Sequence, residues 1–119
     1  MTNERISAYP NTPATVATAV LDAIEQNPKA FDMATWVHLS AQPALKPEDT
    51  PECGTTMCIA GWAAHLTGWT LLGGGIATKG HAREWIEHVA DRALGYGVAD
   101  LFHGSGSDAL AELRKIAGR

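Results

Sequence analysis

Two cysteines and five histidines are the side chains of this sequence that could support metal or thiol chemistry. Four residues separate Cys53 from Cys58, whereas the commonest zinc spacer between cysteine ligands is two residues. A histidine pair with the spacing of a zinc motif is also missing from the set His38, His65, His81, His88 and His103. The spacing therefore argues against a structural zinc, and we expect no metal or other cofactor.

The same two cysteines could form a redox pair. Cys58 stands near the start of a predicted helix, whose dipole would favour a thiolate, and Cys53 could come within bridging distance. However, buried free cysteines usually act as small apolar fillers, and thiols stay reduced in the cytoplasm. We favour the filler interpretation, and a thiol-based redox or metal-binding protein using Cys53 and Cys58 is the alternative.

A cysteine nucleophile would need a histidine within hydrogen-bond reach. His65 lies about 10 Å further along the same predicted helix, which is too far to activate Cys58. We expect His65 to flank the core beside Trp62 and the remaining histidines to face solvent. The sequence therefore indicates no catalytic residue.

The chain is rich in tryptophan, with four of these residues against two phenylalanines. Trp62 and Trp85 fall on helical apolar stripes, and we expect both in the core. Trp36 and Trp69 stand at the edges of predicted elements, where an amphipathic ring can cover the core or anchor a partner. These two are the candidate residues for protein contact.

A central helix over about 56–67 is predicted from the long apolar run that contains Trp62. Thr55 or Thr56 can cap its first turn, and Gly68 can end it in the left-handed conformation. Ala60, Gly61 and Ala64 leave the helix backbone open to close packing. A helix this apolar is expected to be buried on most sides.

The first third of the chain divides at proline signals. Residues 1–11 are predicted to form a flexible N-terminal arm, and residues 12–119 a single domain. Thr12 followed by Pro13 starts a helix that runs to about Gln26. The pair Asn27-Pro28 is again a capping residue followed by proline, and it predicts a short second helix to about Ala34.

The sequence does not decide between helix and strand for two short segments. Residues 35–41 could be extended or a frayed helix end, and residues 69–72 could pair with them as a two-stranded ribbon. Residues 42–52, with three prolines, are predicted to form an exposed loop.

The second half of the chain shows a clear helical period. Apolar residues recur at three- and four-residue spacing over 79–94, which predicts one long amphipathic helix. A further turn over 98–102 and a last helix starting at Ser107 complete the predicted elements.

Composition restricts the class of partner. The chain of 119 residues has a formal net charge of −4 and a pI near 5.6, so nucleic acid is not expected. The basic residues Arg114, Lys115 and Arg119 of the last helix make a DNA-binding regulator the third and least favoured option. No apolar run reaches the roughly 20 residues of a membrane span, and no secretory apolar region follows the polar start. We expect a cytoplasmic protein that does not bind membranes.

A longer pattern gives a resemblance. Phe31-Asp32-Met33 with Trp36, then Cys53-Gly54-Thr55 and Cys58-Ile59-Ala60-Gly61-Trp62, resembles a group of small uncharacterised proteins of bacteria, including actinobacteria, and their phages. The similarity extends from about residue 16 to 103. It implies a compact, mostly helical cytoplasmic domain and brings no activity, substrate or catalytic residue.

These observations together predict a mainly α fold. We expect a single compact domain of about five helices around the central helix at 56–67, with the two-stranded ribbon as an option. The leading functional hypothesis is a non-enzymatic interaction or accessory protein of a phage or mobile element. Its partner would be an unidentified host or phage protein, and self-association remains open.

Overall fold

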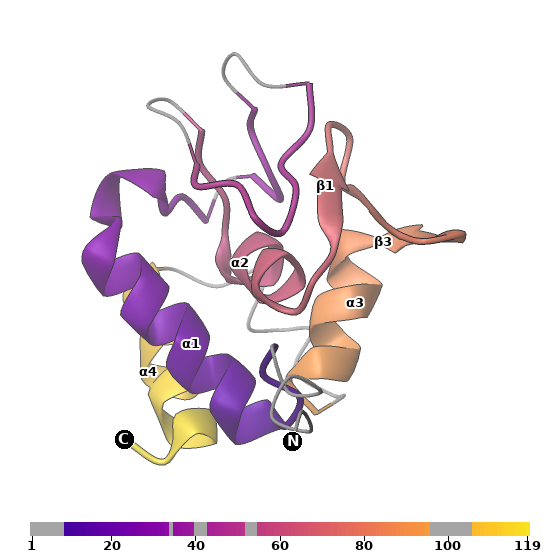
Figure 1. Cartoon of the computed structure of the whole chain (residues 1–119). Helices are drawn as coiled ribbons and strands as arrows, with labels where there is room; N and C mark the ends of the chain where they lie inside the picture. Colours follow the sequence, from indigo (N-terminus) through magenta and orange to yellow (C-terminus); the bar gives the residue numbers. More distant parts are fainter. Residues whose placement is uncertain (1–8, 34, 40–42, 52–54, 96–105) are drawn as a thin grey trace, which may run out of the picture.

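A computed structural model describes residues 9–33, 35–39, 43–51, 55–95 and 106–119 of the chain. Within them lie four α-helices, a short 3₁₀ helix and a three-stranded antiparallel sheet. The prediction of a mainly α domain of about five helices with at most a two-stranded ribbon is therefore wrong. Figure 1 shows the helix α2 (Ile59–Leu66) at the centre, with α1 (Pro13–Gln26) on one side and α3 (Ile86–Ala93) on the other.

The helix α1 begins and ends where its sequence signals predict. Thr12 and Thr15 form a reciprocal capping box, in which the Thr12 Oγ1 accepts from the Thr15 N–H at 3.2 Å. The side chain of Asn27 donates back to the Ala23 carbonyl at 2.9 Å and satisfies one of the last free carbonyls. The predicted second helix to Ala34 is only a 3₁₀ turn, η2 (Pro28–Ala30).

The central helix is buried as predicted but starts later, at Ile59 rather than at residue 56. The segment before it is extended because its backbone groups form hydrogen bonds with other segments of the chain. The Met57 N–H donates to the Ala30 carbonyl at 2.9 Å, and Thr56 exchanges two hydrogen bonds with His38. Thr56 and Met57 therefore form β-bridges instead of a first helical turn, and Cys58 takes the N-cap position.

A loop carbonyl lies against the open backbone of α2 at Gly61. A Cβ at this position would collide with the Trp36 carbonyl oxygen and approach the Met57 Cβ to 2.6 Å. The small residues of α2 are predicted to leave its backbone open to close packing, and at Gly61 the polypeptide around Trp36 packs there.

The sheet consists of β1 (Thr70–Leu72), β2 (Ile76–Lys79) and β3 (Ala82–Trp85), in that order. Residues 69–72 are thus partly a strand, but their partner is β2 and not the Trp36 segment. The other edge of β1 is covered by Leu45, whose N–H and carbonyl both bond to Leu71 at 2.9 and 2.8 Å. Leu45 is completely buried, so the predicted exposed loop over 42–52 is wrong at this residue.

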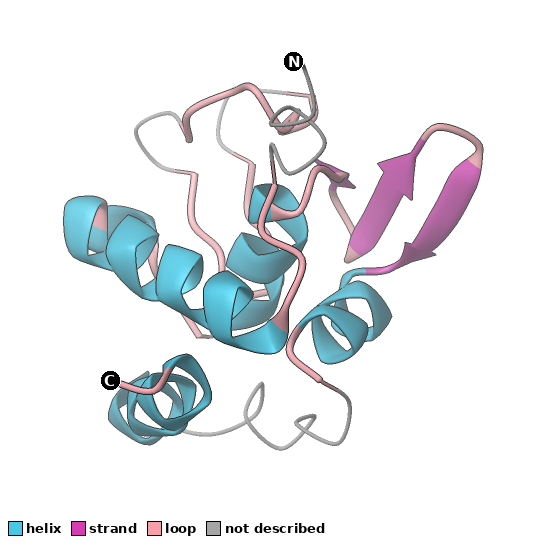
Figure 2. Ribbon diagram, turned by 60° about the horizontal axis from the view of Figure 1, so that its bottom comes forward, coloured by secondary structure: helices cyan, strands magenta, loops and turns pink. Residues whose placement is uncertain are grey.

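The predicted helix over 79–94 divides into two elements. A two-residue turn at Gly80 and His81 reverses the chain, so that Lys79 pairs with Ala82 and the strands β2 and β3 form a hairpin. Gly80 has a positive φ of 61°, a conformation that glycine adopts without steric cost. The helix α3 begins only at Ile86. Figure 2 shows the hairpin projecting to one side of the helices.

The last helix, α4 (Gly106–Ala117), packs along α1. Leu113 and Ala109 are its buried residues, and Arg119 beyond its end pairs with Asp22 of α1 at 3.1 Å. The predicted turn over 98–102 lies outside the described residues. No helix within the described ranges is long and apolar enough to cross a membrane.

Candidate functional site

Cys58 is buried at the N-cap of α2 and carries a free thiol. Burial raises the pKa of this thiol above its ordinary value, and backbone groups of Gly61 and Ala60 offset the rise only in part. The side chain makes no cap hydrogen bond. Cys58 is therefore a protonated core residue at neutral pH, which suits the filler interpretation. Cys53 lies outside the described residues, so the alternative hypothesis that it forms a thiol pair with Cys58 is not tested.

His65 lies against Trp62, as predicted, with the two rings edge to face and their centroids 6.0 Å apart. Burial lowers the pKa of His65, because the cation would be poorly solvated there. The other described histidines, His38, His81 and His88, are exposed. In the ranges that the structure describes, no group of three or more histidine, cysteine or acidic residues could hold a metal ion.

The two faces of the sheet differ sharply. Leu71 and Ala77, which pair across β1 and β2, are completely buried against the helices. Glu84 pairs with Ala77 from β3 and reaches Arg92 of α3 through two hydrogen bonds of 2.9 and 3.1 Å. This face therefore points toward α2 and α3, and the alternate residues of each strand point the other way.

The opposite face carries an apolar row that crosses all three strands. Leu72 pairs with Ile76, and Ile76 pairs with Trp85. Leu72 and Ile76 are partly exposed, and Trp85 is 55% exposed. We call these three residues the Trp85 row. Next to it on the same face lies a polar row of Thr70, Thr78 and Arg83.

The two predicted contact residues, Trp36 and Trp69, lie in different parts of the structure. Trp36 is partly buried and lies beside the turn before β2, where a Cβ on Gly75 would be 3.3 Å from its ring. It therefore lies at the same end of the sheet as Ile76. Trp69 is only 8% exposed and lines a pocket instead. Neither position tests whether these two residues contact a partner.

The most exposed tryptophan was expected in the core. The prediction that Trp85 is buried required residues 79–94 to form one helix. The hairpin turn at Gly80 instead places Trp85 in the strand β3. The available signal was the glycine followed by a polar residue between Thr78 and Arg83, which is typical of a two-residue hairpin loop.

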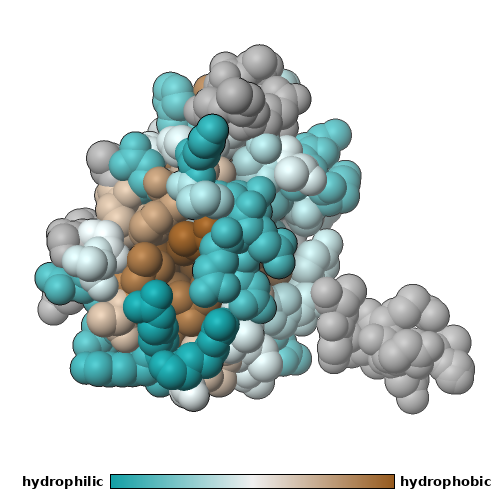
Figure 3. All heavy atoms as spheres, turned by 90° about the vertical axis from the view of Figure 1, so that its left-hand side faces the viewer, coloured by the Kyte–Doolittle hydropathy of each residue, from teal (hydrophilic) through white to brown (hydrophobic). Residues whose placement is uncertain are grey.

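A second apolar area lies on the side of α1 and α4. Figure 3 shows hydrophobic surface gathered in a hollow there, with hydrophilic side chains around it. Partly buried apolar residues of these helices and of the segment after η2 include Ala23, Phe31, Leu110 and Ile116. Of the basic residues at the end of the chain, Lys115 pairs with Glu112 and Arg119 with Asp22, and Arg114 is exposed.

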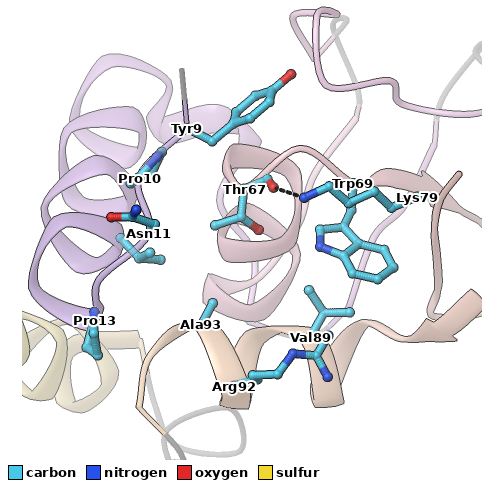
Figure 4. Close-up of a pocket in the computed structure, with 11 residues that line it drawn as sticks. Tyr9, Pro10, Asn11, Pro13, Thr67, Trp69, Lys79, Val89, Arg92 and Ala93 are labelled. Atoms are coloured by element: carbon cyan, nitrogen blue, oxygen red, sulfur yellow. Dashed lines mark hydrogen bonds between the residues drawn. The ribbon is translucent and has the colours of Figure 1, made fainter. Parts of the chain in front are cut away.

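A pocket of about 460 Å³ opens between the start of α1, the end of α2 and α3. Lys79 crosses its upper wall and donates to the Thr67 carbonyl at 3.1 Å, with its ammonium 5.7 Å from the centre of the Trp69 ring (Figure 4). Tyr9 and Asn11 enclose it from the N-terminal side. The pocket lies on the helix-facing side of the sheet, away from the Trp85 row.

Comparison of the chain with protein-family models, with curated proteins and with solved structures gave no match.

Proposed function

We propose that this chain is a non-enzymatic accessory protein that binds another protein through the Trp85 row. The observation that carries the proposal is the 55% exposure of Trp85 on a sheet face where Ile76 and Leu72 continue the apolar surface. Single exposed apolar side chains are common, whereas an aligned apolar row with an aromatic residue is typical of contact sites.

The sheet also offers a second means of attachment. Among the residues that the structure describes, the strand β3 is at the edge of the sheet and pairs with β2 alone. An edge strand can accept an added strand from a partner, in which main-chain hydrogen bonds supply affinity and side-chain contacts supply specificity. Arg83 and Trp85 point to the exposed face of β3. Side chains on the same face of an added strand would therefore lie next to these two residues.

The partner surface follows from these groups. An extended segment with apolar side chains would cover the Trp85 row, and an acidic side chain beside it would pair with the exposed Arg83. Trp36 lies at the same end of the sheet and keeps its proposed role as a contact residue at the rim. The thiol-based alternative would need a thiolate at Cys58, and the raised pKa of that residue works against it.

The proposed setting is the cytoplasm, with a host or phage protein as the partner. The test is a quantitative pull-down with the full chain and two variants, Trp85→Ala and Gln26→Ala. Gln26 is exposed at the far end of α1, so its variant is the matched control. The proposal expects a partner that is retained by Gln26→Ala and lost with Trp85→Ala.

Equal recovery by both variants would contradict the proposal. Sedimentation of the purified chain separates a further outcome. A dimer that Trp85→Ala dissociates would show that the row binds a second copy of the chain, and the proposal of a different partner protein would then be wrong.

A further inference from the structure

We propose that the pocket beside Trp69 binds a small planar organic anion, with its carboxylate held by Lys79 and Trp69 and its ring between apolar walls. The pocket volume of about 460 Å³ falls within the range of small-molecule sites. This binding site lies on the opposite side of the sheet from the Trp85 row and is independent of it.

The charges around the pocket favour an anion. The charged residues that line it, Lys79 and Arg92, are both cationic, although the whole chain has a net charge of −4. Arg92 forms a bidentate pair with Glu84, which cancels much of its charge. Lys79 therefore supplies the net positive charge on the pocket wall.

The donors converge at one end of the pocket. The Lys79 ammonium carries three N–H donors, and one of them donates to the Thr67 carbonyl. Figure 4 shows the indole nitrogen of Trp69 on the pocket side of its ring. The ammonium lies over that ring, 5.7 Å from its centre, so the two donor groups line the same end of the pocket, and the proposed carboxylate would accept from both there.

The rest of the pocket suits a flat apolar body. The aliphatic residues of the lining come from two helices, Val16 from α1 and Val89 and Ala93 from α3, and Pro13 adds the edge of its ring. Val16 and Val89 are almost completely buried and support this side of the pocket from the core. An aromatic ring bearing one carboxylate combines the size, the shape and the charge that these groups match.

The probe for the test is 2-naphthoate, titrated into the ¹⁵N-labelled full chain with its indole N–H signals observed by NMR. Two related probes, the neutral 2-naphthalenemethanol and the cationic 2-naphthylmethylamine, isolate the effect of charge. The proposal expects 2-naphthoate to shift the Trp69 indole signal, with affinity at least about tenfold above that of either related probe.

Two matched variants locate the contact. Lys79→Gln should weaken 2-naphthoate binding about tenfold, whereas Arg83→Gln removes one cation from the opposite face and should leave it unchanged. Lys79→Arg keeps the charge and should retain most of the affinity, which shows that the pocket still folds. Trp85→Ala should bind the probe like the unmodified chain.

Any of three results would overturn the proposal: no shift of the Trp69 signal by 2-naphthoate, equal binding of the neutral probe, or equal weakening by Lys79→Gln and Arg83→Gln. Because Trp85→Ala affects only the protein-binding proposal, failure of one proposal leaves the other intact.

Discussion

Trp85 lies directly opposite Ile76 across the β2–β3 ladder, on the sheet face that points away from α2 and α3. Their neighbours in the strands, Glu84 and Ala77, form the next pair and point toward the helices. The alternation of the two strands thus places Ala77 and Glu84 on the helix-facing side and Ile76 and Trp85 on the opposite side. The functional proposal rests on this separation.

The exposure of Trp85 predicts a small effect of its removal on stability. Trp85→Ala should change the free energy of unfolding by less than about 1 kcal/mol, because most of the ring is already in water. Trp62→Ala should cost roughly 3–5 kcal/mol, since Trp62 is 2% exposed in the core. Denaturant unfolding of both variants measures the difference. Equal losses would show that Trp85 is packed.

Close packing at Gly61 predicts a strong response to one added methyl group. Gly61→Ala should lower the free energy of unfolding by roughly 1–3 kcal/mol, although alanine favours a helix, because the new Cβ meets the Trp36 carbonyl. Gly106→Ala is the control, since among the described residues a Cβ there meets only Phe31, at an ordinary 3.8 Å. A stable Gly61→Ala protein would mean that the loop around Trp36 is not tightly held.

His65 predicts a loss of stability in mild acid. Its folded pKa is lowered from 6.5 by burial, whereas the unfolded chain titrates at the ordinary value. The unfolded state therefore binds more protons in the window below 6.5, so stability falls as the pH drops through that window and is unaffected above it. Denaturation midpoints between about pH 7.5 and 5 measure the slope.

The matched variants for the pH dependence of stability are His65→Gln and His81→Gln. The first removes the buried imidazole and should flatten the pH dependence, and the second removes an exposed one and should leave it unchanged. The account fails here if the two variants keep the same slope.

Cys58 predicts a thiol that reacts only after unfolding. In a Cys53→Ser background, alkylation of the native chain at neutral pH should be far slower than that of an unfolded sample, because the thiol is buried and its pKa is raised. Mass spectrometry of timed samples gives both rates. Rapid alkylation of the native chain would favour the redox interpretation.

The elements that the sequence predicted well have local causes. The helix α1 starts at a threonine cap and ends at an asparagine that bonds back to it, and both signals lie within a few residues. The burial of Trp62 and its contact with His65 followed from one apolar helical stripe. Such features depend little on the rest of the chain.

The errors have causes that a local pattern does not contain. Residues 82–94 fit a helical period throughout, but strand pairing of Lys79 with Ala82 governs the first part. Because residues 82–85 form a strand, Trp85 is exposed, whereas a helix would have placed it in the core. Leu45 is buried because its backbone pairs with Leu71 at the edge of β1. The sequence of the proline-rich segment around Leu45 does not contain this information. The pocket unites residues from distant segments, and no sequence spacing could have indicated it.

The most direct test of the functional account is hydrogen–deuterium exchange of the chain with and without the partner recovered in the pull-down. The account predicts slower exchange in the backbone of residues 76–85, because the partner covers the Trp85 row and the edge of β3. Slower exchange confined to α1 and α4, beside the other apolar area, would contradict it.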